Sequence, residues 1–128
     1  MQSGSAVDTS VMIDYLRGNE HARTLIKDAD AIFLPATVLG ELLFGVKNSR
    51  NRMRDLPKTR EFLSHYKSLP ITTEVAEIYS NTKAALLSAG SLIPENDIWI
   101  AACALANKLP LMTFDQHFSR IEKLEVIG

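Results

Sequence analysis

Short apolar runs alternate along the chain with longer segments in which apolar residues recur at helical spacing. The runs have the length of strands and lie at residues 6–8, 31–35, 69–72, 110–113 and 124–127. The helical segments between and after them lie at residues 10–18, 20–30, 36–47, 52–68, 73–89 and 96–108, with a short one from Gln116. Strands separated by helices are typical of a parallel sheet covered on both faces. The pattern therefore predicts a three-layer α/β/α sandwich around a mainly parallel sheet of about four to five strands.

Length and composition indicate one globular domain. The chain has 128 residues, of which 46% are hydrophobic and 23% charged, which excludes a disordered or fibrous protein. The first residues, MQSGSA, have the small and polar composition of a cloning remnant. We therefore expect residues 1–5 to be such a remnant or a disordered N-terminus, and residues 6–128 to form a single domain.

Neither a membrane segment nor an export signal is recognisable in the sequence. No run reaches the length of a spanning helix, and no basic segment precedes an apolar one at the N-terminus. The single cysteine, Cys103, lies in the apolar stretch AACALA and is predicted to be a core residue. These features lead us to expect a cytoplasmic protein without a membrane partner.

Three aspartates lie at the ends of predicted elements. Asp8 ends the first strand, Asp115 follows the strand at 110–113, and Asp97 opens the helix that leads into that strand, with Asn96 available to cap the helix. In open parallel sheets, ligands bind beyond the carboxyl ends of the strands. The three carboxylates are therefore expected to converge at one edge of the sheet.

Converging carboxylates repel one another, because ordinary aspartates and glutamates are ionised at neutral pH. Either protons or a cation must neutralise them, and a donor set made only of oxygens favours Mg²⁺ or Mn²⁺. Zinc has little support, since the three histidines and Cys103 lie far apart without paired spacing. The number of negative charges favours a bound metal ion over protons as the species that neutralises the carboxylates.

Four segments of the chain resemble the conserved blocks of PIN-domain proteins, especially the VapC-type toxins of toxin-antitoxin pairs. The segments are VDTSVMIDYLRG, PATVLGELLFG, NDIWIAACALA and LPLMTFDQHFSRI, and together they span nearly the whole chain. The resemblance implies that each block supplies one acid to a metal site: Asp8, Glu41, Asp97 and Asp115. It also implies a PIN-like fold, an endoribonuclease that uses Mg²⁺ or Mn²⁺, a homodimer, and a cognate antitoxin whose C-terminal segment blocks the acidic groove.

The four acids are expected to have different roles. We assign Asp8 and Asp97 as the central metal ligands. Glu41 and Asp115 bind a second ion, hold ordered water or position the attacking water, and the sequence leaves these roles open. The hydroxyls of Ser10 and Thr113 are candidates to orient the carboxylates or contact a phosphate, with Ser10 preferred over Thr9. His117 is expected to be a surface histidine, and Trp99 to pack within the helical layer.

The formal net charge is −1, but positive charge is concentrated in one segment. Six of the fourteen basic residues fall within residues 47–60. Arg50, Arg52 and Arg54 are therefore candidates to hold RNA phosphates beside the acidic site. A solvated helix face and a contact with the antitoxin or a second subunit remain alternatives. The apolar face around Leu42, Phe44 and Val46 fits either a dimer interface or burial within the monomer.

Two other classes of protein remain open. In an α/β phosphatase, Asp8 would be the nucleophile, but such sites have a second aspartate where Ser10 stands, and a phosphoenzyme trap would identify them. A PIN-like module could instead bind RNA or protein without catalysis. Assaying RNA cleavage with Mn²⁺ and with a chelator separates that module from a nuclease.

Overall fold

The structure, a computed structural model, describes residues 4–128 and contains one five-stranded sheet. The strand order is β3-β2-β1-β4-β5, and all four pairings are parallel. This architecture confirms the α/β prediction and places β1 at the centre. The strands are β1 (Ser5–Val7), β2 (Ile32–Pro35), β3 (Lys67–Leu69), β4 (Leu111–Met112) and β5 (Val126–Ile127).

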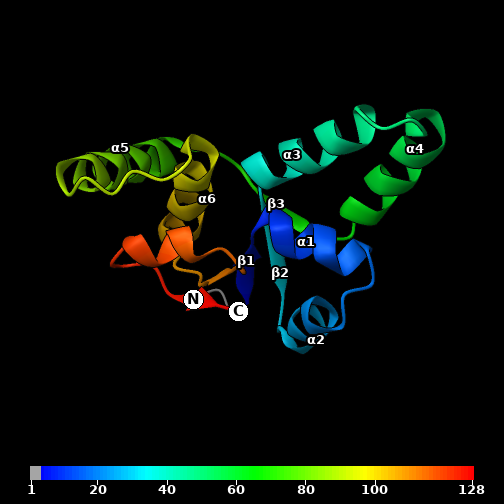
Figure 1. The fold of residues 1–128 in the computed structure, drawn as a ribbon, viewed down its shortest axis with the longest axis horizontal. Coiled ribbons are helices and arrows are strands. Elements are labelled where there is room, and N and C mark those ends of the chain that lie inside the picture. The colour runs from blue at the N-terminus through cyan, green and yellow to red at the C-terminus, as the bar shows by residue number, and fades with distance from the viewer. Residues whose placement is uncertain (1–3) are drawn as a thin grey trace.

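Six α-helices of the described part of the chain flank the sheet, with α5 and α6 on one side and α1 to α4 on the other (Figure 1). This division follows from right-handed crossovers, because the chain moves from β1 to β3 in one direction and returns past β1 to reach β4. The helices are α1 (Thr9–Leu16), α2 (Glu20–Asp28), α3 (Ala36–Lys47), α4 (Arg52–Leu63), α5 (Thr73–Ser88) and α6 (Glu95–Ala106), followed by the 3₁₀ helix η1 (Gln116–Arg120).

The core lies around β1 and α6. Ala6 and Val7 of β1 are fully buried, and α6 contacts β1, β2, α3 and α5. Such a helix is surrounded by protein, which explains why its sequence is apolar almost all round. Cys103 is fully buried, as predicted, and Trp99 stacks on Tyr79 of α5 with ring centroids 3.7 Å apart.

The third strand was placed incorrectly from the sequence. The predicted helix at 52–68 ends at Leu63, and the strand expected at 69–72 begins at Lys67. β3 is an edge strand, and its Lys67 and Ser68 are exposed. An exposed edge strand lacks the apolar run that marks a buried one, so the pattern shifted its expected position along the chain.

The N-terminal boundary of the fold also differs from the prediction, because β1 begins at Ser5 and the domain was expected to begin at residue 6. Ser5 is buried in β1, and its N–H donates to the carbonyl of Ala31 across 2.9 Å. The expectation for Met1, Gln2 and Ser3 falls outside the described residues. Within residues 4–128, no helix is long and apolar enough to cross a membrane.

Candidate active site

The four acids expected from the sequence come from four elements that meet at the carboxyl edge of the sheet. Asp8 directly follows β1, and Asp115 lies just past the neighbouring strand β4. Asp97 lies in the first turn of α6, and Glu41 lies on α3, which packs against α6. The structure thus brings all four acids together.

Asp8 is the most enclosed of the four, with only 5% of its surface exposed. Its Oδ1 accepts a hydrogen bond from the Thr9 N–H at 2.8 Å, so the residue caps α1. Its Oδ2 accepts from the hydroxyls of Thr113 at 2.8 Å and Ser10 at 3.1 Å. Burial raises the pKa of Asp8, the three hydrogen bonds oppose this, and the charge of Asp115 adds to it. The side chain is therefore both a helix cap and a rigidly held carboxylate inside the acidic cluster.

Glu41 is also held by hydrogen bonds from neighbouring elements. The hydroxyl of Thr9 donates to its Oε1 at 2.7 Å, and the side-chain amide of Asn96 donates to its Oε2 at 3.4 Å. From the sequence, Ser10 was preferred over Thr9 as a residue that orients a carboxylate, but both hydroxyls do so: Ser10 donates to Asp8 and Thr9 to Glu41. The sequence offered Asn96 as a possible cap of α6, but the cap position is Pro94, and the Asn96 side chain reaches across to Glu41 on α3 instead.

The pKa of Asp97 is shifted by the charges of the other acids in the cluster. Its pKa is raised from 3.8 to about 6, mainly by burial and then by the charges of Asp8, Asp115 and Glu41, while His117 lowers it. Each of these acids must be close to Asp97 for its charge to matter. The cluster is therefore one electrostatic unit with an excess of negative charge.

Thr113 links the two strands that carry Asp8 and Asp115. It is 3% exposed, and its hydroxyl accepts a hydrogen bond from the Asp115 N–H at 3.0 Å while donating to Asp8. Asp115 in turn caps η1, because its Oδ1 accepts from the N–H of His117 at 2.9 Å. One buried hydroxyl thus fixes the spacing between two of the acids.

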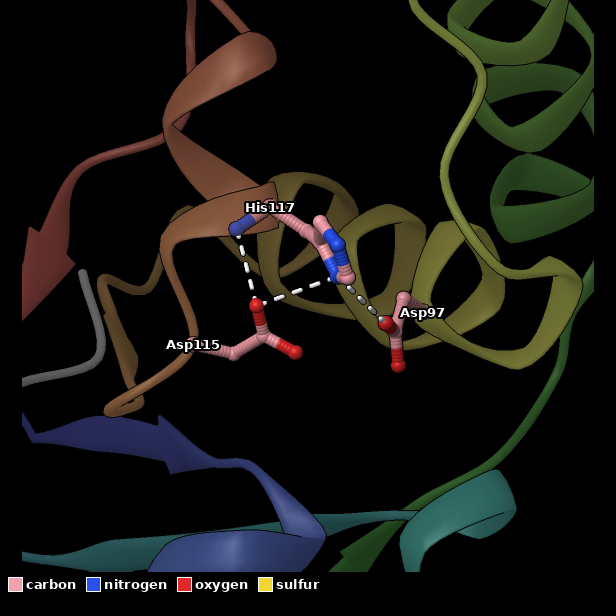
Figure 2. Close-up of side chains that lie close together, drawn as sticks. All are labelled: Asp97, Asp115 and His117. Carbon is pink, nitrogen blue, oxygen red and sulfur yellow. Dashed lines mark hydrogen bonds and ion pairs between the residues drawn. The ribbon is translucent and has the colours of Figure 1, made fainter.

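His117 lies partly exposed on the short helix η1, as expected, but it also belongs to this cluster, which the sequence prediction did not include. Its Nδ1 lies 3.1 Å from Asp115 Oδ1 and 4.0 Å from Asp97 Oδ2 (Figure 2). One ligating atom from each of these three residues lies within 4.8 Å of the others. The side chain is 43% exposed, so the residue is both partly solvent-facing and part of the site. The only sequence signal was its position two residues after Asp115, at a turn that could fold back.

The three arginines that the sequence suggested as RNA contacts lie after α3 and at the start of α4, outside the acidic cluster. Arg50 lies in the turn between α3 and α4, and Arg52 and Arg54 lie in the first turn of α4; all three are exposed. Arg54 forms an ion pair with Asp55 at 2.9 Å. An open groove begins at Glu41 and follows α1, α3 and α4 toward this turn, with Arg17, Gly45 and Ser49 among its lining residues. Arg17 was not anticipated, and it places a positive charge along this groove.

Comparison with known proteins identifies the family of this chain. The sequence profile of the PIN domain matches residues 6–124, and the chain belongs to this family. It is 31% identical to Ribonuclease VapC of Rickettsia bellii, covering 97% of this chain and 95% of that protein. It is 29% identical to Ribonuclease VapC5 of Mycobacterium tuberculosis, covering 94% and 89%. The resemblance to VapC-type proteins is therefore confirmed.

Solved structures agree with the fold. DNA-bound VapBC from Salmonella typhimurium has a TM-score of 0.90 at 23% identity, with 98% of both chains covered. VapBC-5 from Mycobacterium tuberculosis has a TM-score of 0.78 at 26% identity, with 96% of both chains covered. The first of these relationships supports the PIN-like fold alone.

Proposed function

We propose that this chain is an endoribonuclease that uses Mg²⁺ or Mn²⁺ to hydrolyse RNA phosphodiester bonds and acts as the toxin of a toxin-antitoxin pair. The observation that carries the proposal is the meeting of Asp8, Glu41, Asp97 and Asp115 in one electrostatic unit. The ribonuclease names of the relatives support the choice of RNA as substrate.

The donor set fits a hard divalent ion. Four carboxylates crowd together, and the pKa of Asp97 is raised to about 6 by burial and by its neighbours' charges. A group whose ionised form is disfavoured in this way gains most from a nearby cation. Oxygen-rich sites of this kind suit Mg²⁺ and Mn²⁺. The Nδ1 of His117 also faces the cluster without a hydrogen-bond partner among the described residues.

The protein's own contribution to hydrolysis is a fixed arrangement of negative charges. The backbone and hydroxyl donors around Asp8 and Glu41 hold these carboxylates before the substrate arrives, so little reorganisation is needed during the reaction. When bound, the divalent ion would activate water and stabilise negative charge on the scissile phosphate. The backbone N–H of Asp115 donates to Thr113, and its carboxylate accepts the N–H of His117, so Asp115 is also held beside the cluster.

A phosphatase mechanism through Asp8 is disfavoured by the hydrogen bonds of that residue. Both of its carboxylate oxygens accept bonds, Oδ1 from the backbone and Oδ2 from two hydroxyls. Such bonds stabilise the carboxylate and lower its reactivity toward phosphorus. Water is therefore the nucleophile in this proposal, and no covalent intermediate forms on the protein.

The groove beside Glu41 is the proposed path of the RNA backbone. Four carboxylates repel phosphates, so positive charge must compensate outside the metal site. Arg17 lines the groove, and the exposed Arg50 directly follows the lining residue Ser49. The exposed Arg52 begins α4, the helix that supplies Asp55 and Thr59 to the lining. Arg54 must release Asp55 before it can contact a phosphate, so we expect it to contribute less.

The proposal includes a cognate antitoxin and a homodimer. Leu16 and Phe44 are 48% and 67% exposed, and they leave apolar surface uncovered on α1 and α3. Leu42, by contrast, is only 6% exposed and belongs to the monomer core, while Phe44 and Val46 remain available to a partner. A Cβ at Gly45 would meet no heavy atom within 4 Å, so packing within the monomer does not require glycine there. We place the activity in the cytoplasm, where RNA and antitoxin occur.

The direct test is cleavage of a mixed RNA substrate by the purified chain with Mn²⁺ or with a chelator. We expect cleavage only with the ion, and its loss in Asp8→Asn. Asp30→Asn is the matched control, because it removes the same charge from an exposed position. RNA binding that persists without cleavage in any arm would instead identify a non-catalytic PIN-like module. Phe44→Glu changes a side chain that is 67% exposed and does not line the groove, so it should weaken antitoxin binding and leave cleavage unchanged; equal antitoxin affinity would exclude this face.

A further inference from the structure

His117 presents an imidazole nitrogen to the acidic cluster without a matching hydrogen bond. The Nδ1 atom is buried, although the side chain as a whole is 43% exposed. It lies 3.1 Å from Asp115 Oδ1, within ion-pair distance, but the two groups are not aligned for a hydrogen bond. A buried polar atom without a partner is rare and calls for a physical explanation.

The local backbone holds the ring in this position. Asp115 caps η1 by accepting the N–H of His117 at 2.9 Å, so the same carboxylate oxygen, Oδ1, lies close to the backbone nitrogen and to the ring Nδ1 of that residue (Figure 2). Phe118, the next residue, is fully buried and anchors the 3₁₀ turn in the core. The imidazole is therefore directed toward Asp97 and Asp115 by the fold.

The separations match those between ligands of one octahedral ion. With metal-ligand distances of about 2.1 Å, adjacent ligands lie about 3.0 Å apart and opposite ligands about 4.2 Å apart. The observed Nδ1 distances are 3.1 Å to Asp115 and 4.0 Å to Asp97. The ligating atoms of all three residues lie within 4.8 Å of one another. Two carboxylates and one imidazole thus surround a space of the right size for an ion.

We infer that His117 binds the divalent ion directly through Nδ1, together with Asp97 and Asp115. This inference rests on the metal site of the proposed function and adds a nitrogen ligand to it. Imidazole suits borderline transition metals, whereas Mg²⁺ strongly prefers oxygen. The site therefore favours Mn²⁺ over Mg²⁺ more strongly than a site made of carboxylates alone.

A direct spectroscopic test is electron spin echo envelope modulation of Mn²⁺ bound to the full chain at about pH 8, where imidazole ligates in its neutral form. A coordinated imidazole couples its ¹⁴N nucleus to the manganese electron spins. We expect this coupling in the unmodified chain and its loss in His117→Ala. His65→Ala is the matched control, because His65 lies beyond α4 with its side chain 67% exposed and should leave the coupling unchanged.

Calorimetry supplies a second readout that does not depend on catalysis. Replacing the imidazole by a carboxylate in His117→Glu should lower the ratio of Mn²⁺ to Mg²⁺ affinity by about tenfold. The half-exposed position should tolerate this change, and circular dichroism checks that the variant is folded. An unchanged ratio in folded His117→Glu would contradict the inference.

The outcomes separate this inference from the proposed function. Mn²⁺ that binds with no ¹⁴N coupling, or with coupling that survives in His117→Ala, overturns the role of His117 and leaves an all-carboxylate site. A chain that binds no Mn²⁺ at all overturns the metal site as well. Coupling that disappears only in the His117 variants establishes the imidazole as a ligand.

Discussion

Removing the charge of Asp97 should stabilise the metal-free protein. Raising a carboxyl pKa from 3.8 to about 6 corresponds to about 3 kcal/mol of unfavourable free energy at neutral pH. Asp97 is not completely enclosed, with its side chain 18% exposed, so solvent screening should reduce this to about 1–2 kcal/mol. We therefore expect Asp97→Asn to raise the free energy of unfolding by about 1–2 kcal/mol in chelator.

The sign of the effect fixes its pH dependence. The folded pKa lies above the unfolded value, so the penalty is complete above pH of about 6 and disappears as the pH falls toward 3.8. Urea unfolding at about pH 7.5 and about pH 4 measures both limits. The advantage of Asp97→Asn should shrink at the lower pH, and exposed Asp30→Asn should show little effect at either.

Added Mn²⁺ should make the unmodified chain more stable than Asp97→Asn, the reverse of the order expected in chelator. An ion at a hundred times its dissociation constant stabilises the unmodified chain by about 2.7 kcal/mol, whereas Asp97→Asn should gain much less. If Asp97→Asn is no more stable than the unmodified chain in chelator at about pH 7.5, the acids do not repel one another as the structure indicates.

Three further predictions concern the acidic cluster and the arginines after α3. Thr113→Val keeps the shape of a buried side chain but removes a donor to Asp8, so urea unfolding should show a loss of about 2 kcal/mol; a change below about 0.5 kcal/mol would rule out a structural role for that bond. Calorimetry should show Mn²⁺ affinity falling as the pH drops below about 6, because Asp97 then holds a proton, and constant affinity at lower pH would argue against Asp97 as a ligand. Replacing Arg50, Arg52 and Arg54 by glutamine should weaken RNA binding and reduce its salt dependence by about two in the logarithmic slope, with unchanged Mn²⁺ affinity; an unaltered slope would assign these arginines to a partner or to solvent.

The arrangement of the sheet could be predicted because its buried strands leave a clear mark in the sequence. Ala6 and Val7, and Leu111 and Met112, are buried on both faces of the sheet and therefore form apolar runs. The acids at the ends of these strands could be placed together by the same reasoning. β3 was misplaced because Lys67 and Ser68 lie on an exposed edge, where burial does not constrain the side chains.

The supporting contacts of the site could not be predicted in the same way. Thr9 and Asn96 reach Glu41 over sequence separations of 32 and 55 residues, and their partners depend on how α1, α3 and α6 pack. The position of His117 depends on the 3₁₀ turn that Asp115 caps. Periodicity identifies elements and their buried faces, but the direction of a polar side chain is decided by tertiary contacts.

The most direct test of the metal site is anomalous diffraction from crystals of the chain soaked in Mn²⁺. We predict a strong anomalous peak among the carboxylates of Asp8, Asp97 and Asp115, and its loss in Asp8→Asn. Anomalous density confined to other surfaces, with these carboxylates unliganded at saturating Mn²⁺, would contradict the central claim.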